Sequence, residues 1–146
     1  SNYMAWGLVE IPGRPNHLSV YASEGYYTGP DSRLRRFEYR KDGFVSIRAS
    51  GETGEFLTKP LKFAGSKLAL NYSTKTTGSL RVELQDAHGK PLRGFTLADC
   101  KPHRGDHIDG IISWKSGADL GRLAGKTVRL QFELKNADLY SLRFVE

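Results

Sequence analysis

The sequence predicts an all-β fold, an antiparallel β-sandwich of jelly-roll type, and three observations lead to this prediction. Four segments alternate apolar and polar side chains, which places the apolar residues on one face of a strand. These segments are residues 68–72, 80–85, 128–134 and 140–144. Turn-forming residues separate strand-like segments at intervals of roughly 8–15 residues. No segment favours a helix longer than about two turns.

Each alternating segment is expected to have one dry face and one wet face, as in a sheet that packs on a core with one side only. Under this rule Leu80, Val82 and Leu84 face the core, whereas Glu83 and Glu133 face solvent. A sheet of this kind offers its outer surface and its loops to a ligand. We therefore expect any binding site to lie on one of these.

Shorter strands are expected in the first half of the chain. They occupy residues 16–22, 33–40, 44–49, 55–58 and 61–63. Asp42-Gly43 favours a tight hairpin turn, so that residues 44–49 would pair with residues 33–40. Pro60 indicates that the strand around it is bent and lies at an edge, because proline cannot donate a ladder hydrogen bond.

The last third of the chain is expected to contain a strand, a helical turn and a hairpin. The strand spans residues 107–114. Asp119 is a candidate N-cap for a single helical turn over residues 119–123. Asn136-Ala137-Asp138 is interpreted as the hairpin turn between the last two alternating segments.

The length of 146 residues suits one domain with a substantial core. No run approaches the roughly 18 apolar residues that a membrane helix requires, and the start lacks a signal-peptide pattern. Ser1-Asn2 without an initiating Met is interpreted as a protease scar on a piece of a longer protein. Residues 1–30 are expected to be the remnant of a preceding domain or the connection from it, and residues 31–146 the β-sandwich.

The net charge is +6, and residues 61–105 hold most of the excess, with eight basic and three acidic side chains. A basic surface attracts polyanions such as sulfated or uronic polysaccharides, lipid headgroups and nucleic acid. Solubility alone is an equally good explanation for a charge of this size. The basic residues are scattered and no aromatic RNA-binding pattern is present, which disfavours nucleic acid.

Cys100 is the single cysteine, so the chain forms neither an intramolecular disulfide nor a cysteine-only zinc site. His103 lies three residues further on, but proximity in sequence is weak evidence for a catalytic dyad. We expect Cys100 to be an inert, partly buried thiol.

Binding of a sugar requires a flat aromatic surface and a few polar groups that hold hydroxyls. Tyr26 and Tyr27 are candidates because they lie in a loop rich in turn residues, where an exposed ring has little structural purpose. Trp114 is a third candidate, with packing in the core or at its rim as the alternative. Trp6 is a fourth, and its alternative role is contact with a neighbouring domain.

The densest polar cluster is the loop of residues 99–109. Its candidate ligand-binding residues are Lys101, His103, Arg104, Asp106 and His107. Arg and Lys hold sulfate or carboxylate groups through charge-assisted hydrogen bonds, and a solvated loop is the alternative. The acidic and His residues lack a fixed ligand spacing, which disfavours a metal site. We expect no cofactor; a structural calcium ion is left open, although no Asp-rich calcium loop is visible.

No catalytic pattern is recognisable in the chain. Hydrolysis of a glycosidic bond requires two carboxylates across a cleft, about 5–10 Å apart, and the sequence does not indicate such a pair. Nothing matches a nucleophile elbow, a phosphate-binding loop or a dinucleotide-binding fingerprint. We therefore expect that the chain is not an enzyme.

Several segments together resemble a known β-sandwich region. They are residues 33–37, 42–46, 80–95, 113–120, 123–132 and 137–144. The region that they resemble closes many bacterial proteins related to the five-bladed-propeller glycoside hydrolases of family 32. The resemblance covers about residues 30–146, and residues 3–28 look similar to the end of the propeller or the connection out of it.

The resemblance implies a non-catalytic accessory module, because the catalytic carboxylates of that family lie in the propeller. Its partners would be a polysaccharide or oligosaccharide, anionic in view of the charge, and a catalytic domain in the same parent chain, with no membrane. The parent protein would be bacterial and secreted or periplasmic. The alternative is a structural domain that braces the propeller and binds no ligand of its own.

Overall fold

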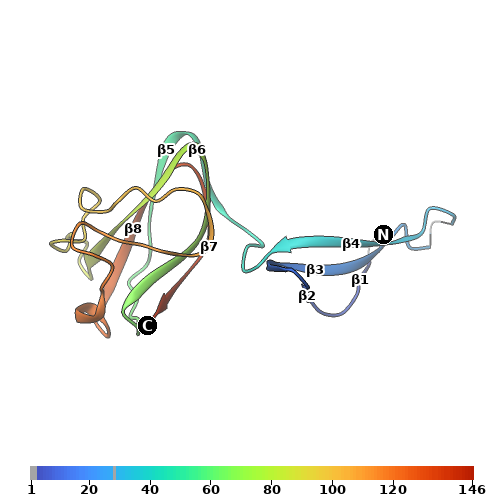
Figure 1. The fold of residues 1–146 in the computed structure, drawn as a ribbon, viewed down its shortest axis with the longest axis horizontal. Helices are drawn as coiled ribbons and strands as arrows, with labels where there is room; N and C mark the ends of the chain where they lie inside the picture. The colour runs from blue at the N-terminus through green and yellow to red at the C-terminus, as the bar shows by residue number, and fades with distance from the viewer. Residues whose placement is uncertain (1–2, 28) are drawn as a thin grey trace. The chain divides into compact units, whose positions relative to one another are not determined.

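The computed structural model describes residues 3–27 and 29–146, and it confirms the predicted all-β fold (Figure 1). The strands are β1 (Tyr3–Met4), β2 (Val9–Ile11), β3 (Arg14–Glu24), β4 (Arg33–Arg40), β5 (Ile47–Leu57), β6 (Lys67–Asp86), β7 (Asp106–Ile111) and β8 (Val128–Val145), and a single turn of 3-10 helix, η1, spans Gly121–Leu123. All pairings between these strands are antiparallel, which is consistent with an all-β sandwich. The jelly-roll type remains a prediction.

The strands form two four-stranded sheets, which belong to two compact units. Unit 1 is Ser1–Phe44 and unit 2 is Val45–Glu146. The predicted boundary lies after residue 30, whereas β4 belongs to unit 1 in the structure. The reason is that β4 pairs with β3 along its whole length, from Arg33 opposite Glu24 to Arg40 opposite His17.

Asp42-Gly43 forms the expected turn, but the turn does not make a hairpin. Asp42 has a φ of 51°, and the Gly43 amide donates a hydrogen bond of 3.1 Å to the Arg40 carbonyl. The next strand, β5, pairs with β8 and has Ile47 opposite Leu139. The predicted pairing of residues 44–49 with residues 33–40 is therefore wrong, because this turn leaves one sheet and leads into the other.

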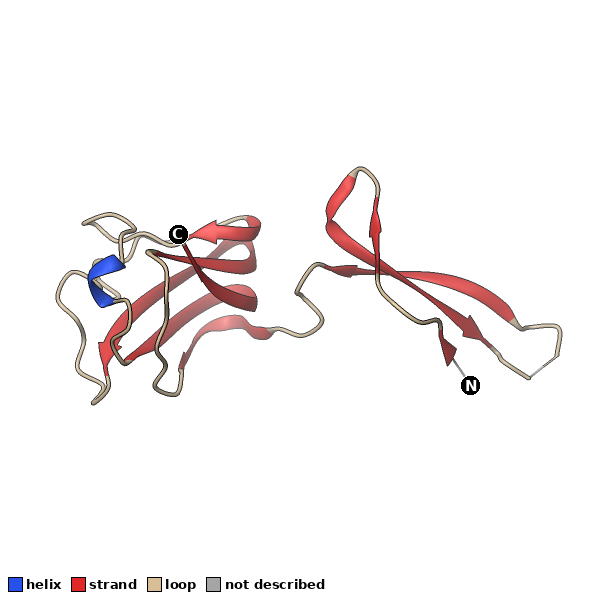
Figure 2. Cartoon of the chain, turned by 90° about the horizontal axis from the view of Figure 1, so that it is seen from below, coloured by secondary structure: helices blue, strands red, loops and turns tan. Residues whose placement is uncertain are grey.

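The sheet of unit 1 has β3 at its centre, with β1 and β2 along one edge and β4 along the other (Figure 2). Residues that pair directly share a face. The apolar face carries Val20, Phe37 and Tyr39, and the tyrosine face carries Tyr3 and Tyr21. Among residues 3–27 and 29–44 no second layer covers this sheet, so large side chains stay exposed on both faces.

The sheet of unit 2 has the order β5-β8-β6-β7, and β6 and β8 pair along nearly their whole length. β6 contains the two alternating segments 68–72 and 80–85, and β8 contains 128–134 and 140–144. The alternation therefore identified the strands correctly, but it divided each long strand into two.

The predicted hairpin at residues 136–138 is wrong, because β8 continues through it. Lys135 pairs with Ser79 and Ala137 pairs with Thr74, so the strand keeps its direction on both sides of Asn136. Asn136 adopts a φ of 43°, a left-handed conformation that asparagine tolerates better than most residues. The turn chemistry of this segment produces an irregularity within a strand and not a reversal.

The core of unit 2 lies on the face that the alternation predicts, where Leu80, Val82 and Leu84 are fully buried. The chain between β6 and β8 covers this face with buried apolar side chains: Phe95, Cys100, Ile112, Trp114, Leu120 and Leu123. The Phe95 ring stands edge-on to Trp114, with ring centroids 5.2 Å apart. This connecting segment supplies the layer that excludes water from the sheet.

The expected helical turn is present as η1, which begins two residues later than predicted and ends at the predicted residue, Leu123. The Asp119 carboxylate accepts a hydrogen bond of 2.7 Å from the Gly121 amide. Leu120, and not Asp119, occupies the N-cap position. Leu120 and Leu123 are buried, so the turn fixes two core side chains.

The two tryptophans provide a matched test of this core. Trp114→Ala should lower the free energy of unfolding by about 3–5 kcal/mol, since removal of a fully buried ring leaves a cavity. The indole nitrogen also donates a 2.9 Å hydrogen bond to the Val82 carbonyl, which would lose its donor. Trp6→Ala should change the free energy of unfolding by no more than about 0.5 kcal/mol, because Trp6 is fully exposed. Guanidinium unfolding followed by circular dichroism measures the change in each variant. Equal changes in the two variants would contradict the placement of Trp114 in the core.

Candidate functional site

Three tyrosine rings meet at one end of the sheet in unit 1, and we call them the tyrosine cluster: Tyr3, Tyr26 and Tyr27. The centroids of the Tyr3 and Tyr26 rings are 4.9 Å apart in an edge-on contact. The centroids of the Tyr26 and Tyr27 rings are 4.1 Å apart and the rings are tilted by 55°. The Tyr27 side chain is nonetheless 87% exposed, so one ring of the cluster faces solvent almost entirely.

The local sequence explains this arrangement. Tyr3 lies in β1 opposite Ser23 of β3, while Tyr26 and Tyr27 follow directly after β3. Tyr27 has a φ of 65°, in the left-handed region that a bulky side chain rarely adopts. Residues in such conformations are concentrated at functional sites. The chain thus bends back at Gly25, whose φ is 63°, and places the Tyr26 ring beside Tyr3 and the Tyr27 ring beside Tyr26.

The tyrosine cluster borders an open hollow of about 530 Å³. Its lining also includes Ser23 and Leu34, which pair across β3 and β4. The Tyr26 hydroxyl donates a hydrogen bond of 3.3 Å to the Tyr27 hydroxyl. This bond and, to a lesser extent, burial raise the pKa of Tyr26, so the Tyr26 phenol remains a neutral hydrogen-bonding group at neutral pH.

A charged group lies on the same face of the sheet. Arg36 is directly opposite Tyr21. Its guanidinium donates a 2.6 Å hydrogen bond to Glu38, which also forms an ion pair with Arg14. The tyrosine face thus combines aromatic rings with two guanidinium groups that share one carboxylate.

The predicted polar loop of residues 99–109 does not form a cluster of free side chains. The His103 ring nitrogen accepts a 3.1 Å hydrogen bond from the Ser113 amide, and burial lowers the pKa of His103. A His107 ring nitrogen lies 3.2 Å from the Arg104 carbonyl. These two imidazoles therefore make contacts with the backbone of their own segment.

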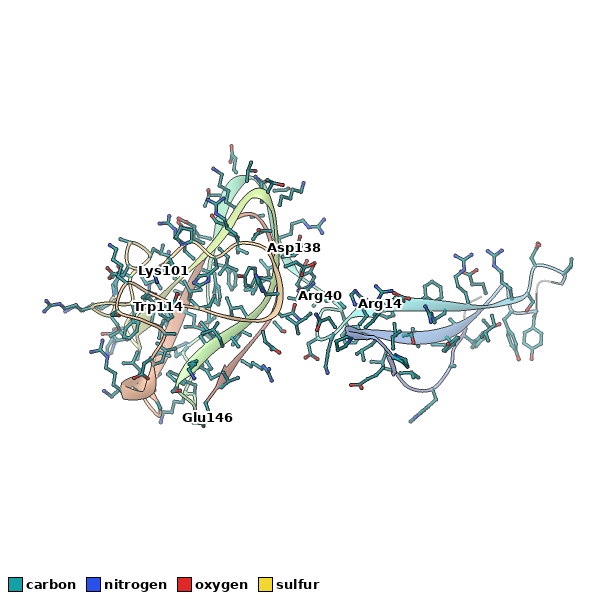
Figure 3. All side chains as sticks on the ribbon, viewed as in Figure 1. Arg14, Arg40, Lys101, Trp114, Asp138 and Glu146 are labelled. Carbon is teal, nitrogen blue, oxygen red and sulfur yellow. The ribbon has the colours of Figure 1, made fainter. Side chains whose placement is uncertain are left out.

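Three other predicted residues of this loop are exposed, as is His107, whereas His103 is only partly exposed. Lys101 and Arg104 are exposed, and Lys101 lies at the surface of unit 2 (Figure 3). The Arg104 backbone carbonyl accepts a hydrogen bond of 3.3 Å from the Tyr72 hydroxyl. This bond involves only the backbone of Arg104, and the Arg104 side chain is exposed to solvent. Asp106 lies at the start of β7, opposite Ser73. Lys101 and Arg104 thus remain able to meet a ligand, whereas His103 is occupied.

Trp114 is a correction to the set of predicted binding residues. Its side chain is fully buried in the core of unit 2, where Figure 3 labels it, and it cannot present a face to a sugar. Tyr26 and Tyr27 lie in unit 1, and the other six predicted residues lie in unit 2. The structure therefore does not bring the eight together within one compact unit.

Glu83 is a second correction, since it does not face solvent freely. It is only 8% exposed, and its carboxylate accepts hydrogen bonds from the Leu97 amide at 3.0 Å and from the Gln85 side chain at 2.9 Å. The reason is that the chain after β6 runs back along the edge of this strand, with the Leu84 amide bonded to the Phe95 carbonyl. Glu83 is thus a structural carboxylate.

Neither a metal site nor a reactive thiol is indicated. Within residues 3–27 and 29–146, no three His, Cys, Asp or Glu side chains are grouped so as to hold a metal ion. Cys100 is buried, and burial raises the pKa of its thiol to about 11. The low thiolate fraction at neutral pH makes Cys100 a poor nucleophile.

Comparisons with models of protein families, with curated proteins and with solved structures found no match to this chain. No helix in the described part of the chain is long and apolar enough to cross a membrane. The function must therefore be inferred from the geometry above.

The environment of His103 generates a pH-dependent prediction. In the unfolded chain this imidazole binds a proton near its ordinary pKa of 6.5, whereas in the folded chain burial lowers the pKa. Protonation would also displace the Ser113 amide from the ring nitrogen. The free energy of unfolding should therefore be unaffected above pH 6.5 and should fall progressively below it.

Denaturant unfolding at a series of pH values from about 7.5 to about 5 measures this effect. His103→Gln should flatten the slope, whereas His88→Gln, at an exposed position, should leave it intact. An unchanged slope in His103→Gln would mean that another group causes the pH dependence.

Proposed function

We propose that the chain is a non-catalytic module that binds a polysaccharide or oligosaccharide through the tyrosine cluster. The observation that carries the proposal is a set of three tyrosine rings beside an open hollow, in which Tyr26 contacts both Tyr3 and Tyr27 and Tyr27 is almost fully exposed. The apolar face of a sugar ring packs on an aromatic ring, while hydroxyls of the ligand bond to nearby polar groups.

Polar groups suited to such binding lie in the lining of the hollow and elsewhere on the same face of the sheet. The Tyr27 hydroxyl, which accepts from Tyr26, keeps its own proton for donation to a sugar hydroxyl. Ser23 lies in the lining of the hollow, and Arg36 lies on the same face of the sheet. The net charge of +6 attracts an anionic polysaccharide to the chain as a whole, and most of this excess lies in residues 61–105 of unit 2.

The wider role in this proposal rests on the family resemblance. The module would be an accessory part of a bacterial glycoside hydrolase that is secreted or periplasmic. It would hold the polysaccharide near a catalytic domain in the same parent chain. Linking a binding module to a catalytic module raises the effective concentration of substrate without any new contact at the active site.

Affinity electrophoresis on gels that contain neutral, uronic or sulfated polysaccharides tests the proposed binding. At least one polysaccharide should retard the chain. Tyr27→Ala should weaken the retardation about tenfold, because loss of one stacked ring removes roughly 1.4 kcal/mol. Arg104→Ala is the comparison for the loop of residues 99–109 in unit 2, and this substitution should leave the retardation unchanged.

The outcomes separate the candidate locations. Loss of retardation in Arg104→Ala alone would move the site to the loop of residues 99–109. Absence of retardation on every polysaccharide in a broad panel would remove carbohydrate binding from consideration.

The second candidate is a structural domain that braces a neighbouring domain and has no ligand of its own. A specific observation favours it: the apolar face of unit 1 remains open. Trp6 is fully exposed, and Met4, Leu8 and Phe44 are about half-exposed. These residues, with Val20 and Tyr39, line a hollow of about 470 Å³. Soluble proteins rarely leave such a patch without a partner.

A fluorescent dye that binds exposed apolar surface tests the bracing role. The unmodified chain should bind the dye, and Trp6→Ser should bind it about half as well, because the side chain that is most exposed is lost. Tyr27→Ala should have little effect, since Tyr27 does not line this hollow. Dye binding that is insensitive to Trp6→Ser would exclude the apolar face as a docking surface.

A further inference from the structure

The sheet of unit 2 is interrupted on both sides of one residue. Ala49 and Thr53 of β5 pair with Ala137 and Lys135 of β8, so that residues 50–52 have only Asn136 opposite them. On the other side, Thr74 and Ser79 of β6 pair with the same two residues, so that residues 75–78 also lie opposite Asn136. Irregularities of this kind re-aim side chains and are frequent next to functional sites.

Asn136 connects the two excursions through its side chain. Its amide oxygen accepts a hydrogen bond of 2.9 Å from the Gly51 amide, and its amide nitrogen donates one of 3.3 Å to the Thr77 hydroxyl. Gly78 is required beside it, because a Cβ there would lie 2.3 Å from the Asn136 carbonyl oxygen. The irregular region is therefore held in place and is not merely a loose pair of loops.

A hollow of about 340 Å³ opens between the two excursions, and we call it the Asn136 hollow. It is lined by residues 48–50, 75 and 136–138. Two of the lining side chains are cationic, Arg48 and Lys75, and both are exposed. Lys75 forms no ion pair with any described residue.

The single carboxylate in the hollow already has partners. Asp138 accepts a hydrogen bond of 2.7 Å from the Nε of Arg48 and one of 2.8 Å from the Ser46 hydroxyl, and Figure 3 labels its position. The hydrogen bond to Asp138 and its charge raise the pKa of Arg48, so the guanidinium stays charged. The two terminal amino groups of Arg48 form no hydrogen bond with a described residue.

The hollow is thus rich in donors and poor in acceptors. Arg48 retains its terminal amino groups, Lys75 retains its ammonium group, and Ser50 adds a hydroxyl. Charge-assisted hydrogen bonds from such groups are the means by which proteins hold sulfate, phosphate and carboxylate. With Asp138 neutralising one of two cations, one positive charge remains for a ligand.

We propose that the Asn136 hollow is a binding site for a small oxyanion group, held by Lys75 and the terminal amino groups of Arg48. The ligand class is a sulfate, a phosphate or a carboxylate, either free or as a substituent of a larger molecule. This site lies in unit 2, and its existence does not depend on the tyrosine cluster of unit 1.

Nuclear magnetic resonance titration of the ¹⁵N-labelled chain tests the site at constant ionic strength. Sodium sulfate, sodium phosphate and sodium glucuronate are added separately, with sodium chloride as the balance. At least one should shift the backbone amide resonances of residues 49–51, 75 and 136–137 to saturation. Lys75→Met should weaken this binding at least fivefold, because it removes a charge-assisted donor. Lys126→Met, at another exposed lysine, should leave it unchanged.

The pattern of saturation identifies the ligand chemistry. A response to glucuronate alone assigns a carboxylate, and a response to sulfate and phosphate assigns a tetrahedral oxyanion. Ser50→Asp, which adds a negative charge to the hollow, should abolish binding and provides a second variant should Lys75→Met fail to fold. Shifts spread over all exposed basic residues, shifts unchanged in Lys75→Met, or no saturation with any of the three salts would overturn the proposal.

Discussion

The pairing between β6 and β8 is the constraint on which the rest of unit 2 depends. These two strands place Val82 opposite Phe132 and Leu84 opposite Leu130 on one face, and all four side chains are fully buried. The connecting chain is attached to the same pair, because Leu80 and His103 exchange two backbone hydrogen bonds of 2.9 Å each. Without this pairing neither the buried Trp114 nor the segment around His103 would have a surface to pack on.

Local patterns in the sequence were sufficient to predict the all-β class and the core face of β6 and β8, but not the bounds of these strands. A period of two in residues 128–134 survives in the structure, where Val128, Leu130, Phe132 and Leu134 are buried and the residues between them are partly exposed. The pattern could not predict which strands pair. Asp42-Gly43 favours a hairpin, and it forms the turn, but pairing of β5 with β8 depends on contacts between residues some ninety positions apart.

The candidate site was predicted less completely, for a similar reason. Tyr26 and Tyr27 stood out because aromatic rings are unusual in a loop of turn residues, but Tyr3 joins them only through the pairing of β1 with β3. Glu83 alternates like a surface residue, yet the chain after β6 returns to cover it. Trp114 was ambiguous, since an apolar strand end gives no indication of whether a ring points in or out.

The two units differ in how completely they bury their own apolar side chains. Unit 2 has a core that closes on itself, whereas unit 1 is close to the size below which a chain of this kind usually needs outside support. Exposed rings on both faces of one thin sheet are the direct result. Unit 1 therefore leaves more of its apolar and aromatic surface exposed than unit 2 does.

The shared attachment at Asn136 constrains the lengths of two loop-like segments of this protein. Residues 50–52 and residues 75–78, which are distant in the chain, are both hydrogen-bonded to the side-chain amide of Asn136. An insertion in either would shift the anchor of the other, although exposed loops normally tolerate changes of length independently. Their lengths are therefore expected to change together, as a matched pair, or not at all.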